Sequence, residues 1–249
     1  MTLHVFDDPR ELAATAAAQA AELIGQAIAE HGAARVTFST GVSQLAFLQH
    51  LTATPNINWQ YVELFHLDEY IGMRGDHPAS FQRFIRERVI EPTGIKKAHL
   101  IDGMADPVQV CRDTGMAISK APIDLEIVGI GENGHLAFND PPADFITEEP
   151  FIIVSLDEQC QLQQVGEGWF ASIAEVPKQA ITMSIRQILK ARAIICIAPE
   201  ARKAEAVRRC FTGDISPLAP ASVLRSHSNV TVYLDQASAR LLEPGVPLA

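Results

Sequence analysis

Apolar residues recur along the chain in two patterns, one typical of amphipathic helices and one typical of buried strands. Asp8-Pro9 precedes apolar residues at helical spacing, which predicts a capped helix that ends near Gly32. Short apolar runs predict strands at 35–39, 59–65, 125–130, 151–154, 193–198 and 230–234. Helical patterns at 45–51, 78–89 and 200–210 separate several of these runs. The alternation predicts an α/β fold with a mostly parallel sheet.

The chain has the length and composition of a single globular domain. Its 249 residues are 47% hydrophobic and 20% charged, which allows one large α/β core. We see no repeat, low-complexity segment or linker, so we expect a single domain over residues 1–249. The loosest segment is 141–150, and we expect it to form a loop or lid over the site.

The net charge and the cysteines narrow the class of protein. A net charge of −10 argues against a nucleic-acid partner, although a small anion can still bind locally. No apolar run approaches membrane length, and the N-terminal residues do not resemble a signal peptide. The four cysteines are scattered along the chain, so we expect them to be reduced thiols. We therefore expect a cytoplasmic protein that does not bind membranes.

The residues after the run at 125–130 carry the densest candidate chemistry. Gly129-Ile130-Gly131-Glu132-Asn133-Gly134 matches the G-x-G-x-x-G pattern of dinucleotide-binding folds, which requires a helix to follow at once. Residues 135–142 are too few and contain two prolines. We predict instead that the glycines make room for a ligand beside His135, a residue able to transfer protons. Asp140 fixes its tautomer, and Asn133 orients either partner. The simpler alternative is a histidine that caps a turn.

A second cluster, His66-Leu67-Asp68-Glu69-Tyr70, follows the predicted strand at 59–65. Side chains alternate along an extended chain, so at most one of the two carboxylates faces a shared pocket. Taken alone, the cluster also fits a solvated acidic turn. A metal site built from His66, Asp68, His77 and His135 matches no standard zinc spacing, and we predict no metal.

Two further features are compatible with an anion site. Ser39-Thr40-Gly41-Val42-Ser43 joins a predicted strand to a helix, where backbone amides and hydroxyls can bind an anion. Lys203, in the first turn of a late helix, adds a positive charge. Both features have ordinary interpretations, as a common strand–helix turn and as a surface lysine.

Together, these segments resemble the glucosamine-6-phosphate deaminase (isomerase) family of the 6-phosphogluconolactonase superfamily. The matching stretches are 64–70, 76–80, 129–141 and 176–183, and the resemblance is colinear over essentially the whole chain. It implies a Rossmann-like, three-layer fold that converts glucosamine 6-phosphate and water to fructose 6-phosphate and ammonia. It also implies no metal and no redox cofactor, with a small phosphosugar as the bound partner. An oligomer is compatible with it.

The resemblance implies a role for each candidate residue. Asp68 is the base that moves a proton from C2 to C1, and His135 opens the pyranose ring. Asp140 supports His135, and Asn133 occupies a position that holds Asp or Asn in the family. The phosphate-binding positions are matched by Thr40, Gly41, Ser43 and Lys203, with Ser39 and Val42 in the same loop. An aldose–ketose shift needs such a carboxylate and such an acid.

Three positions depart from the family pattern. Gln44 stands where the phosphate loop commonly has proline, and Asp140 stands where Glu is usual. Because Asp is shorter, its hydrogen bond to His135 is expected to need a backbone shift or a water. The segment Gly166-Glu167-Gly168-Trp169-Phe170 lacks the arginine that typical family members carry before a Phe-Phe pair. This departure concerns which sugar is bound and whether the protein is allosterically regulated.

Two other functions are compatible with the same residues. One is a 6-phosphogluconolactonase-like hydrolase in which His135 activates water and Asp68 is not required. The other is a non-catalytic sugar-phosphate sensor, which binds its ligand without turnover.

Overall fold

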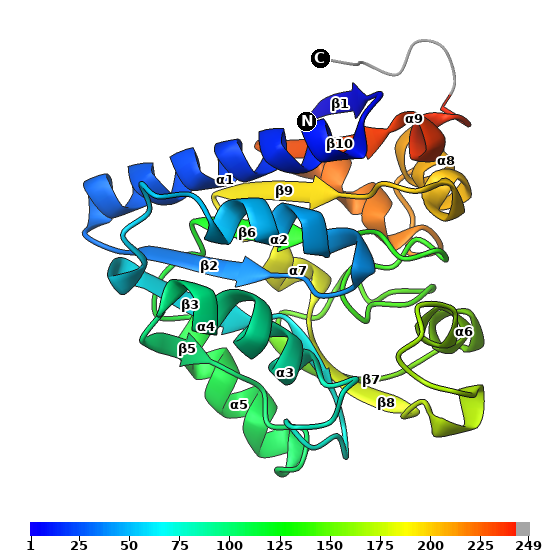
Figure 1. Cartoon of the computed structure of the whole chain (residues 1–249). Helices are drawn as coiled ribbons and strands as arrows, with labels where there is room; N and C mark the ends of the chain where they lie inside the picture. Colours follow the sequence, from blue (N-terminus) through cyan, green and yellow to red (C-terminus); the bar gives the residue numbers. More distant parts are fainter. Residues whose placement is uncertain (243–249) are drawn as a thin grey trace.

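A computed structural model describes residues 1–242, and its centre is a parallel β-sheet (Figure 1). Within these residues the sheet has seven strands, and every neighbouring pair is parallel. In spatial order they are β1 (Thr2–Phe6), β10 (Val230–Asp235), β9 (Ala193–Ile197), β6 (Leu125–Val128), β2 (Ala34–Phe38), β3 (Val62–His66) and β5 (Lys97–His99). The predicted α/β, Rossmann-like fold with a mostly parallel sheet is confirmed.

A smaller antiparallel sheet lies against the main one. Its order is β4 (Asp68–Tyr70), β8 (Gln179–Met183) and β7 (Phe151–Ser155). The run at 151–154 therefore belongs to this sheet and not to the parallel one. Its exposure alternates from Ile152 to Ser155, as expected for a strand with one face toward solvent.

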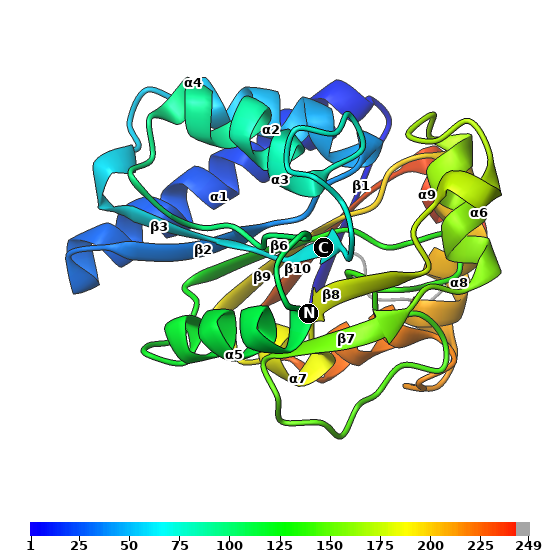
Figure 2. The same cartoon turned by 90° about the horizontal axis from the view of Figure 1, so that it is seen from below.

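Helices cover both faces of the main sheet, which gives three layers (Figure 2). On one side lie α1 (Pro9–His31), α2 (Leu45–Thr52), α3 (Phe81–Ile85) and α4 (Glu91–Thr93). On the other side lie α5 (Pro107–Ile118) and α7 (Ile185–Ile188), together with the small sheet. Beyond the carboxyl ends of the strands lie α6 (Glu158–Gly166), α8 (Ala204–Thr212) and α9 (Gln236–Ala239).

The two ends of α1 are determined by residues that can be recognised in the sequence. Asp8 accepts a hydrogen bond from the amide of Arg10 (2.8 Å), and Pro9 occupies the first turn, where no amide donor is needed. Gly32 adopts a φ of 76° and ends the helix, a conformation that glycine adopts without steric cost. The predicted helix from Pro9 to Gly32 is thereby confirmed.

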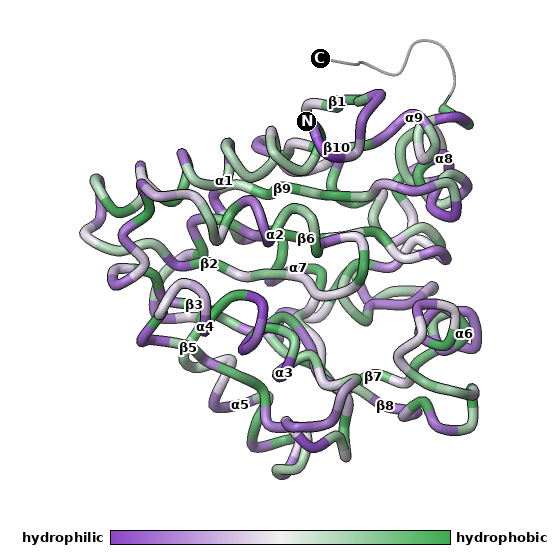
Figure 3. Tube along the Cα trace, viewed as in Figure 1, coloured by the Kyte–Doolittle hydropathy of each residue, from purple (hydrophilic) through white to green (hydrophobic). Residues whose placement is uncertain are grey.

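Apolar clusters pack on both faces of the sheet, and β9 appears as a continuous hydrophobic segment in Figure 3. Val36, Leu64 and Ile195 pack on the side of α1 and α2. Phe65 and Ile194 pack on the opposite side, together with residues of β8. Among residues 1–242, no helix combines the length and the apolar character needed to cross a bilayer.

Several element limits differ from the sequence prediction. Trp59–Tyr61 forms a 3-10 turn, so β3 begins at Val62 rather than at residue 59. The helix expected from Pro78 begins at Phe81, because Ser80 is the residue that caps it. Ala201–Lys203 is another 3-10 turn that precedes α8. The elements that were not predicted are the strands β1, β4, β5 and β8 and the helices α5, α6, α7 and α9.

The order of the strands determines where a ligand can bind. From β2 the chain proceeds to β3 on one side, and from the neighbouring β6 it continues to β9 on the other. Connections that leave in opposite directions open a crevice at the carboxyl ends of the two strands. The segments that follow β2 and β6 are the two loops singled out in the sequence.

Candidate active site

One cavity lies at this crevice and encloses about 580 Å³ of empty space, part of it open to solvent. Its walls include the predicted residues Ser39, Thr40, Gly41, Val42, Ser43, Asp68, His135 and Lys203. Gly129 and Gly131 also line it, as do Ile197, the last residue of β9, and Gln163, Gln164 and Glu167 from α6 and its end.

The loop after β2 forms one end of the cavity. Gly41 has a φ of 105°, a conformation that favours glycine, and its backbone leads into the 3-10 turn Val42–Gln44 and then into α2. Amides at such a helix start are available to an anion. Gln44, at the position where proline was expected, is buried and donates from Nε2 to the carbonyl of Ile197 (3.1 Å). This bond ties the loop to β9.

Lys203 reaches the same end of the cavity. Its side chain is buried and makes no hydrogen bond or ion pair with any residue in 1–242. Burial, together with the neighbouring charge of Arg202, lowers the pKa of Lys203 to about 8. A buried ammonium without a partner is costly unless an anion is bound beside it.

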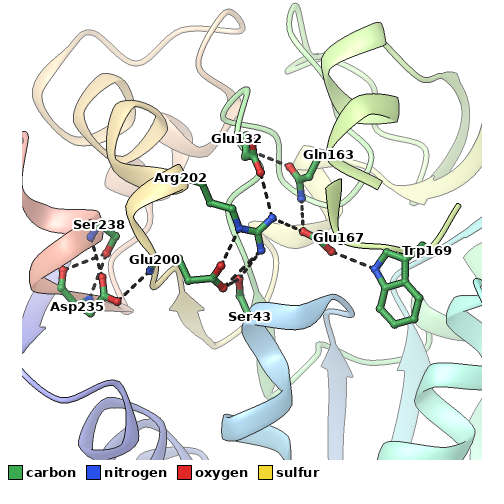
Figure 4. A network of polar contacts seen from close by, with 9 residues as sticks. All are labelled: Ser43, Glu132, Gln163, Glu167, Trp169, Glu200, Arg202, Asp235 and Ser238. Carbon is green, nitrogen blue, oxygen red and sulfur yellow. Dashed lines mark hydrogen bonds and ion pairs between the residues drawn. The ribbon is translucent and has the colours of Figure 1, made fainter. Parts of the chain in front are cut away.

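Arg202, by contrast, is fully engaged in a polar network (Figure 4). Its guanidinium contacts Glu132 (3.0 Å), Glu167 (2.7 Å) and Glu200 (2.8 Å). Glu167 also accepts hydrogen bonds from Gln163 and from the indole of Trp169. The network holds the end of α6 against the loop before α8. Arg202 is thus engaged by three carboxylates, whereas the ammonium of Lys203 forms no hydrogen bond or ion pair among residues 1–242.

His135 lines the cavity from the segment that follows β6. A Cβ on Gly131 would come within 2.3 Å of the His135 ring, so only glycine allows the imidazole to lie over this backbone. Gly134 has a φ of 93° and turns the chain toward His135. The glycine pattern therefore serves to place the histidine. Residues 131–150 contain no helix, which agrees with the prediction that this glycine pattern is not a dinucleotide-binding site.

Asp140 and Asn133 do not line the cavity, but both form hydrogen bonds with His135. The Nδ1 atom of His135 lies 3.0 Å from Asp140 Oδ1, so the shorter side chain makes the contact directly. Asn133 donates to the same oxygen (2.9 Å) and accepts from the amide of His135 (3.0 Å). Burial raises the pKa of Asp140, but the bonds from His135, Asn133 and the Asp157 amide outweigh it and lower that pKa. With Nδ1 engaged, Nε2 is the nitrogen available to a ligand.

Asp68 and Glu69 point in different directions, as expected for successive strand residues. Asp68, the first residue of β4, lines the cavity and is 5% exposed. Burial, and then the charge of Glu69, raise its pKa well above the usual value. Glu69 accepts hydrogen bonds from Ser80 Oγ (2.6 Å) and from the Gln82 amide (2.8 Å), which anchors β4 to α3.

An apolar wall stands beside Asp68. The rings of Phe81 and Phe138 stack with centroids 5.5 Å apart, and both residues line the cavity. Tyr70 packs against both rings and donates its hydroxyl to Gln164 (2.9 Å). This aromatic group connects β4 to α6.

The considered metal set does not assemble. His66 is buried on β3 and accepts the Ile101 amide, while His77 accepts the Ala79 amide, and neither lines the cavity. Among the described residues, the possible ligand atoms of His135, Asp140 and Cys160 do lie within 4.8 Å of one another. Burial raises the pKa of the Cys160 thiol well above its usual value, which favours the protonated form, and metals bind the thiolate. The donor set does not favour a metal.

The segment 141–150 is a loop, as predicted, but it does not cover the cavity. None of its residues lines the cavity, and Ala143 packs in the core cluster that includes residues of β8. The covering element is α6 with the residues after it. Its contributions (Gln163, Gln164 and Glu167) were missed, although Glu167 lies in the segment that departs from the family pattern.

The model for glucosamine-6-phosphate isomerases/6-phosphogluconolactonase matches residues 7–233 of the chain. A glucosamine-6-phosphate deaminase of Lactobacillus delbrueckii subsp. bulgaricus is 36% identical over 228 residues, or 90% of this chain and 94% of the relative. One of Streptococcus pyogenes serotype M1 is 34% identical over 213 residues, or 85% of this chain and 89% of the relative.

Solved structures show the same fold. A monomeric glucosamine-6-phosphate deaminase superposes with a TM-score of 0.88 at 33% identity, covering 97% of this chain and all of the other. A 6-phosphogluconolactonase from Shewanella baltica superposes with a TM-score of 0.79 at 21% identity, covering 94% of this chain and 97% of the other.

Proposed function

The chain belongs to the glucosamine-6-phosphate isomerase/6-phosphogluconolactonase family, and we propose that it converts glucosamine 6-phosphate and water to fructose 6-phosphate and ammonia. One observation carries this proposal. A single cavity presents a carboxylate (Asp68), an imidazole held by a carboxylate (His135) and an unpartnered ammonium (Lys203). Such a set can hold a phosphate at one end and move protons at the other.

The phosphate binds at the loop 39–43 beside Lys203. The glycine backbone and the start of α2 offer amide donors, and Ser43 and Thr40 offer hydroxyls. The Lys203 ammonium becomes paired only when this anion is present. Holding the phosphate away from the reacting carbons contributes to positioning, which supplies much of the rate in such reactions.

The sugar ring then lies between His135 and Asp68. His135 Nε2 transfers a proton to the ring oxygen, and the O1 hydroxyl loses one, so that the pyranose opens to the aldehyde. Asp140 and Asn133 keep the imidazole oriented during this transfer. The aromatic pair Phe81 and Phe138 packs beside the carbon chain.

Asp68 carries out the isomerisation. It removes the C2 proton while the aldehyde oxygen O1 takes up a proton, which gives an enolamine. It then delivers the proton to C1 while the amino nitrogen gives up a proton, which leaves an imine at C2 and a hydroxyl at C1. Water adds to C2, and the carbinolamine releases ammonia to give the C2 ketone of fructose 6-phosphate. The overall reaction consumes one water. Asp68 transfers the proton between the carbons, and His135 transfers the proton to the ring oxygen.

The test is an assay of ammonia and fructose 6-phosphate from the purified protein with glucosamine 6-phosphate. A panel that includes galactosamine 6-phosphate determines which amino sugar is used. We expect turnover with the glucosamine compound. A folded protein that binds the sugar phosphates without any turnover would support a sensor instead.

A variant separates deamination from lactone hydrolysis. In deuterated water, Asp68→Asn is expected to abolish exchange of the C2 proton, while the fold is retained in circular dichroism. Exchange that persists in this variant would rule out Asp68 as the base. Hydrolysis of 6-phosphogluconolactone that is insensitive to Asp68→Asn would favour the lactonase function.

A further inference from the structure

A buried carboxylate, Glu167, stands at the end of the cavity that we assign to the phosphate. It follows α6 and lines the cavity, and its side chain is 6% exposed. A Cβ on Gly41 would lie 3.7 Å from Glu167 Oε2, so this oxygen lies beside the backbone of the loop 39–43. A phosphate ester carries a charge of about −1.5 to −2 at pH 7, and like charges repel strongly where water is excluded. Phosphate binding beside Glu167 therefore needs a compensating cation.

Arg202 supplies a cation to Glu167 from another part of the chain. It lies in the 3-10 turn Ala201–Lys203 before α8, and its Nη1 is 2.7 Å from Glu167 Oε1. Its Nη2 is 3.4 Å from Ser43 Oγ, so the guanidinium also touches the loop 39–43. The segment 166–170 lacks the arginine of typical family members, yet an arginine side chain contacts it from the turn before α8 (Figure 4).

Glu167 is held in its ionised form. Burial raises its pKa, but the hydrogen bond and charge of Arg202 outweigh burial, with help from the charge of Lys203 and the indole of Trp169, and lower that pKa. Gln163 Nε2 donates to Oε1 (2.9 Å), and Trp169 Nε1 donates to Oε2 (3.1 Å). A carboxylate fixed by these donors stays charged at neutral pH, so a bound phosphate meets its charge.

The two other carboxylates that pair with Arg202 affect a ligand less. The side chains of Glu132 and Glu200 are 38% and 40% exposed, so water screens their charges. Neither residue lines the cavity, and Arg202 does not line it either. Of these four charged groups, Glu167 is the one that faces the ligand, and Arg202 acts on the ligand through Glu167.

The pair also determines what Lys203 can do. The ammonium of Lys203 is buried at the same end of the cavity and makes no hydrogen bond or ion pair within residues 1–242. If Arg202 were neutral, Lys203 would be the remaining cation whose charge favours ionised Glu167. A buried carboxylate that loses its partner is costly, so the ammonium would compensate Glu167 and not the phosphate.

We propose that Arg202 is a positioning residue of the phosphate site: by pairing with Glu167 it compensates the buried carboxylate beside the loop 39–43 and keeps the Lys203 ammonium available to the phosphate. The inference rests on the proposed function, because it assumes that the phosphate binds at this loop. Arg202 does not touch the ligand. The affinity for an anion thus depends on a pair of side chains of which only one lines the cavity.

The test removes the two charges singly and together. The variants are Arg202→Gln, Glu167→Gln and the double variant. The control is Arg74→Gln, which removes an arginine from an exposed ion pair with Asp76 (2.9 Å) outside the cavity. Inorganic phosphate is titrated into each protein by calorimetry at pH 7 and low ionic strength, which needs no turnover. KM and kcat for glucosamine 6-phosphate are measured in parallel, and circular dichroism reports folding.

Arg202→Gln should weaken phosphate binding about tenfold and raise KM by a similar factor, with little change in kcat, because the phosphate is remote from the reacting carbons. Glu167→Gln should bind phosphate at least as tightly as the wild type. The double variant should return to within about threefold of the wild type, because the amide no longer opposes the anion. This recovery distinguishes charge compensation from a bridging role, since the double variant lacks the ion pair as well. Arg74→Gln should match the wild type.

Two outcomes would overturn the inference. One is a phosphate affinity and a KM in Arg202→Gln that equal those of the wild type. The other is a double variant that binds phosphate as weakly as Arg202→Gln, which would mean that the guanidinium contacts the anion or serves only as a bridge. If Arg202→Gln does not fold, the double variant is compared with Glu167→Gln. Equal affinities support the inference, and a loss of about tenfold overturns it.

The same titration keeps this inference apart from the proposed reaction. If the wild type deaminates no hexosamine phosphate but the phosphate affinities follow the expected order, the reaction fails while the role of Arg202 stands. If the wild type deaminates glucosamine 6-phosphate and the double variant shows no recovery in phosphate affinity or KM, the reaction stands while the role of Arg202 fails.

Discussion

The stability of the protein should depend on pH through Glu126, and a single substitution isolates this dependence. In the fold, burial raises the pKa of Glu126 to about 8, against an ordinary value of 4.5. Between these values the folded state keeps a proton that the unfolded chain releases. Stability therefore falls as the pH rises through this window, by about 1.4 kcal/mol per pH unit for this one group.

Glu126→Gln removes that contribution because glutamine does not titrate. The difference in unfolding free energy between variant and wild type should shift in favour of the variant by about 3 kcal/mol between pH 5.5 and pH 7.5. Other buried groups, such as His66 and Lys203, remain in both proteins, so their contributions cancel. The amide carries its own cost of burial, but that cost does not vary with pH.

The assay is urea unfolding followed by circular dichroism at pH 5.5, 6.5 and 7.5, with equal protein concentrations. Glu11→Gln is the matched control, because Glu11 is an exposed residue of α1. Its difference from the wild type should stay the same at each pH. Parallel stability curves for Glu126→Gln and the wild type would refute the claim that Glu126 is protonated in the fold.

Three further substitutions test the assembled site by steady-state assay of ammonia release. Lys203→Met should raise KM about 10- to 100-fold, and the wild-type KM should itself rise above pH 8, because burial and Arg202 lower the pKa of Lys203 to about 8. A KM unaffected by this change would place the phosphate elsewhere. Asp140→Asn should lower kcat roughly 100-fold by releasing His135, and wild-type kcat would show that the pair is structural. Gly131→Ala should displace the His135 ring and lower kcat in a folded protein, whereas full activity would contradict the 2.3 Å approach.

The sequence was most informative where local rules determine the structure. The cap at Asp8, the stop at Gly32 and the apolar runs led to the helices and parallel strands, because each depends on neighbouring residues. The short strand β4 could not be read in this way. It has three residues, and its partner β8 lies more than 100 positions further along the chain.

The same division applies to the site. The loop 39–43, Asp68 and His135 follow the carboxyl ends of β2, β3 and β6, and their meeting at one cavity follows from a parallel sheet. Glu126 could not be recognised from the sequence, because a single charged residue within an apolar run is not distinctive. The contributions of α6 were hidden too, because its residues are mostly polar and pattern alone does not tell which of them point inward.

The proposed base and the proposed acid lie on different sheets of the protein. His135 and the loop 39–43 extend from the main sheet, whereas Asp68 is carried by β4, an edge strand that pairs only with β8 within residues 1–242. Substitutions in β7 and β8 are therefore expected to shift Asp68 relative to His135 while the loop 39–43 stays in place. This makes the small sheet the region where selection, natural or in the laboratory, can retune the protein for amino sugars of different configuration at C2.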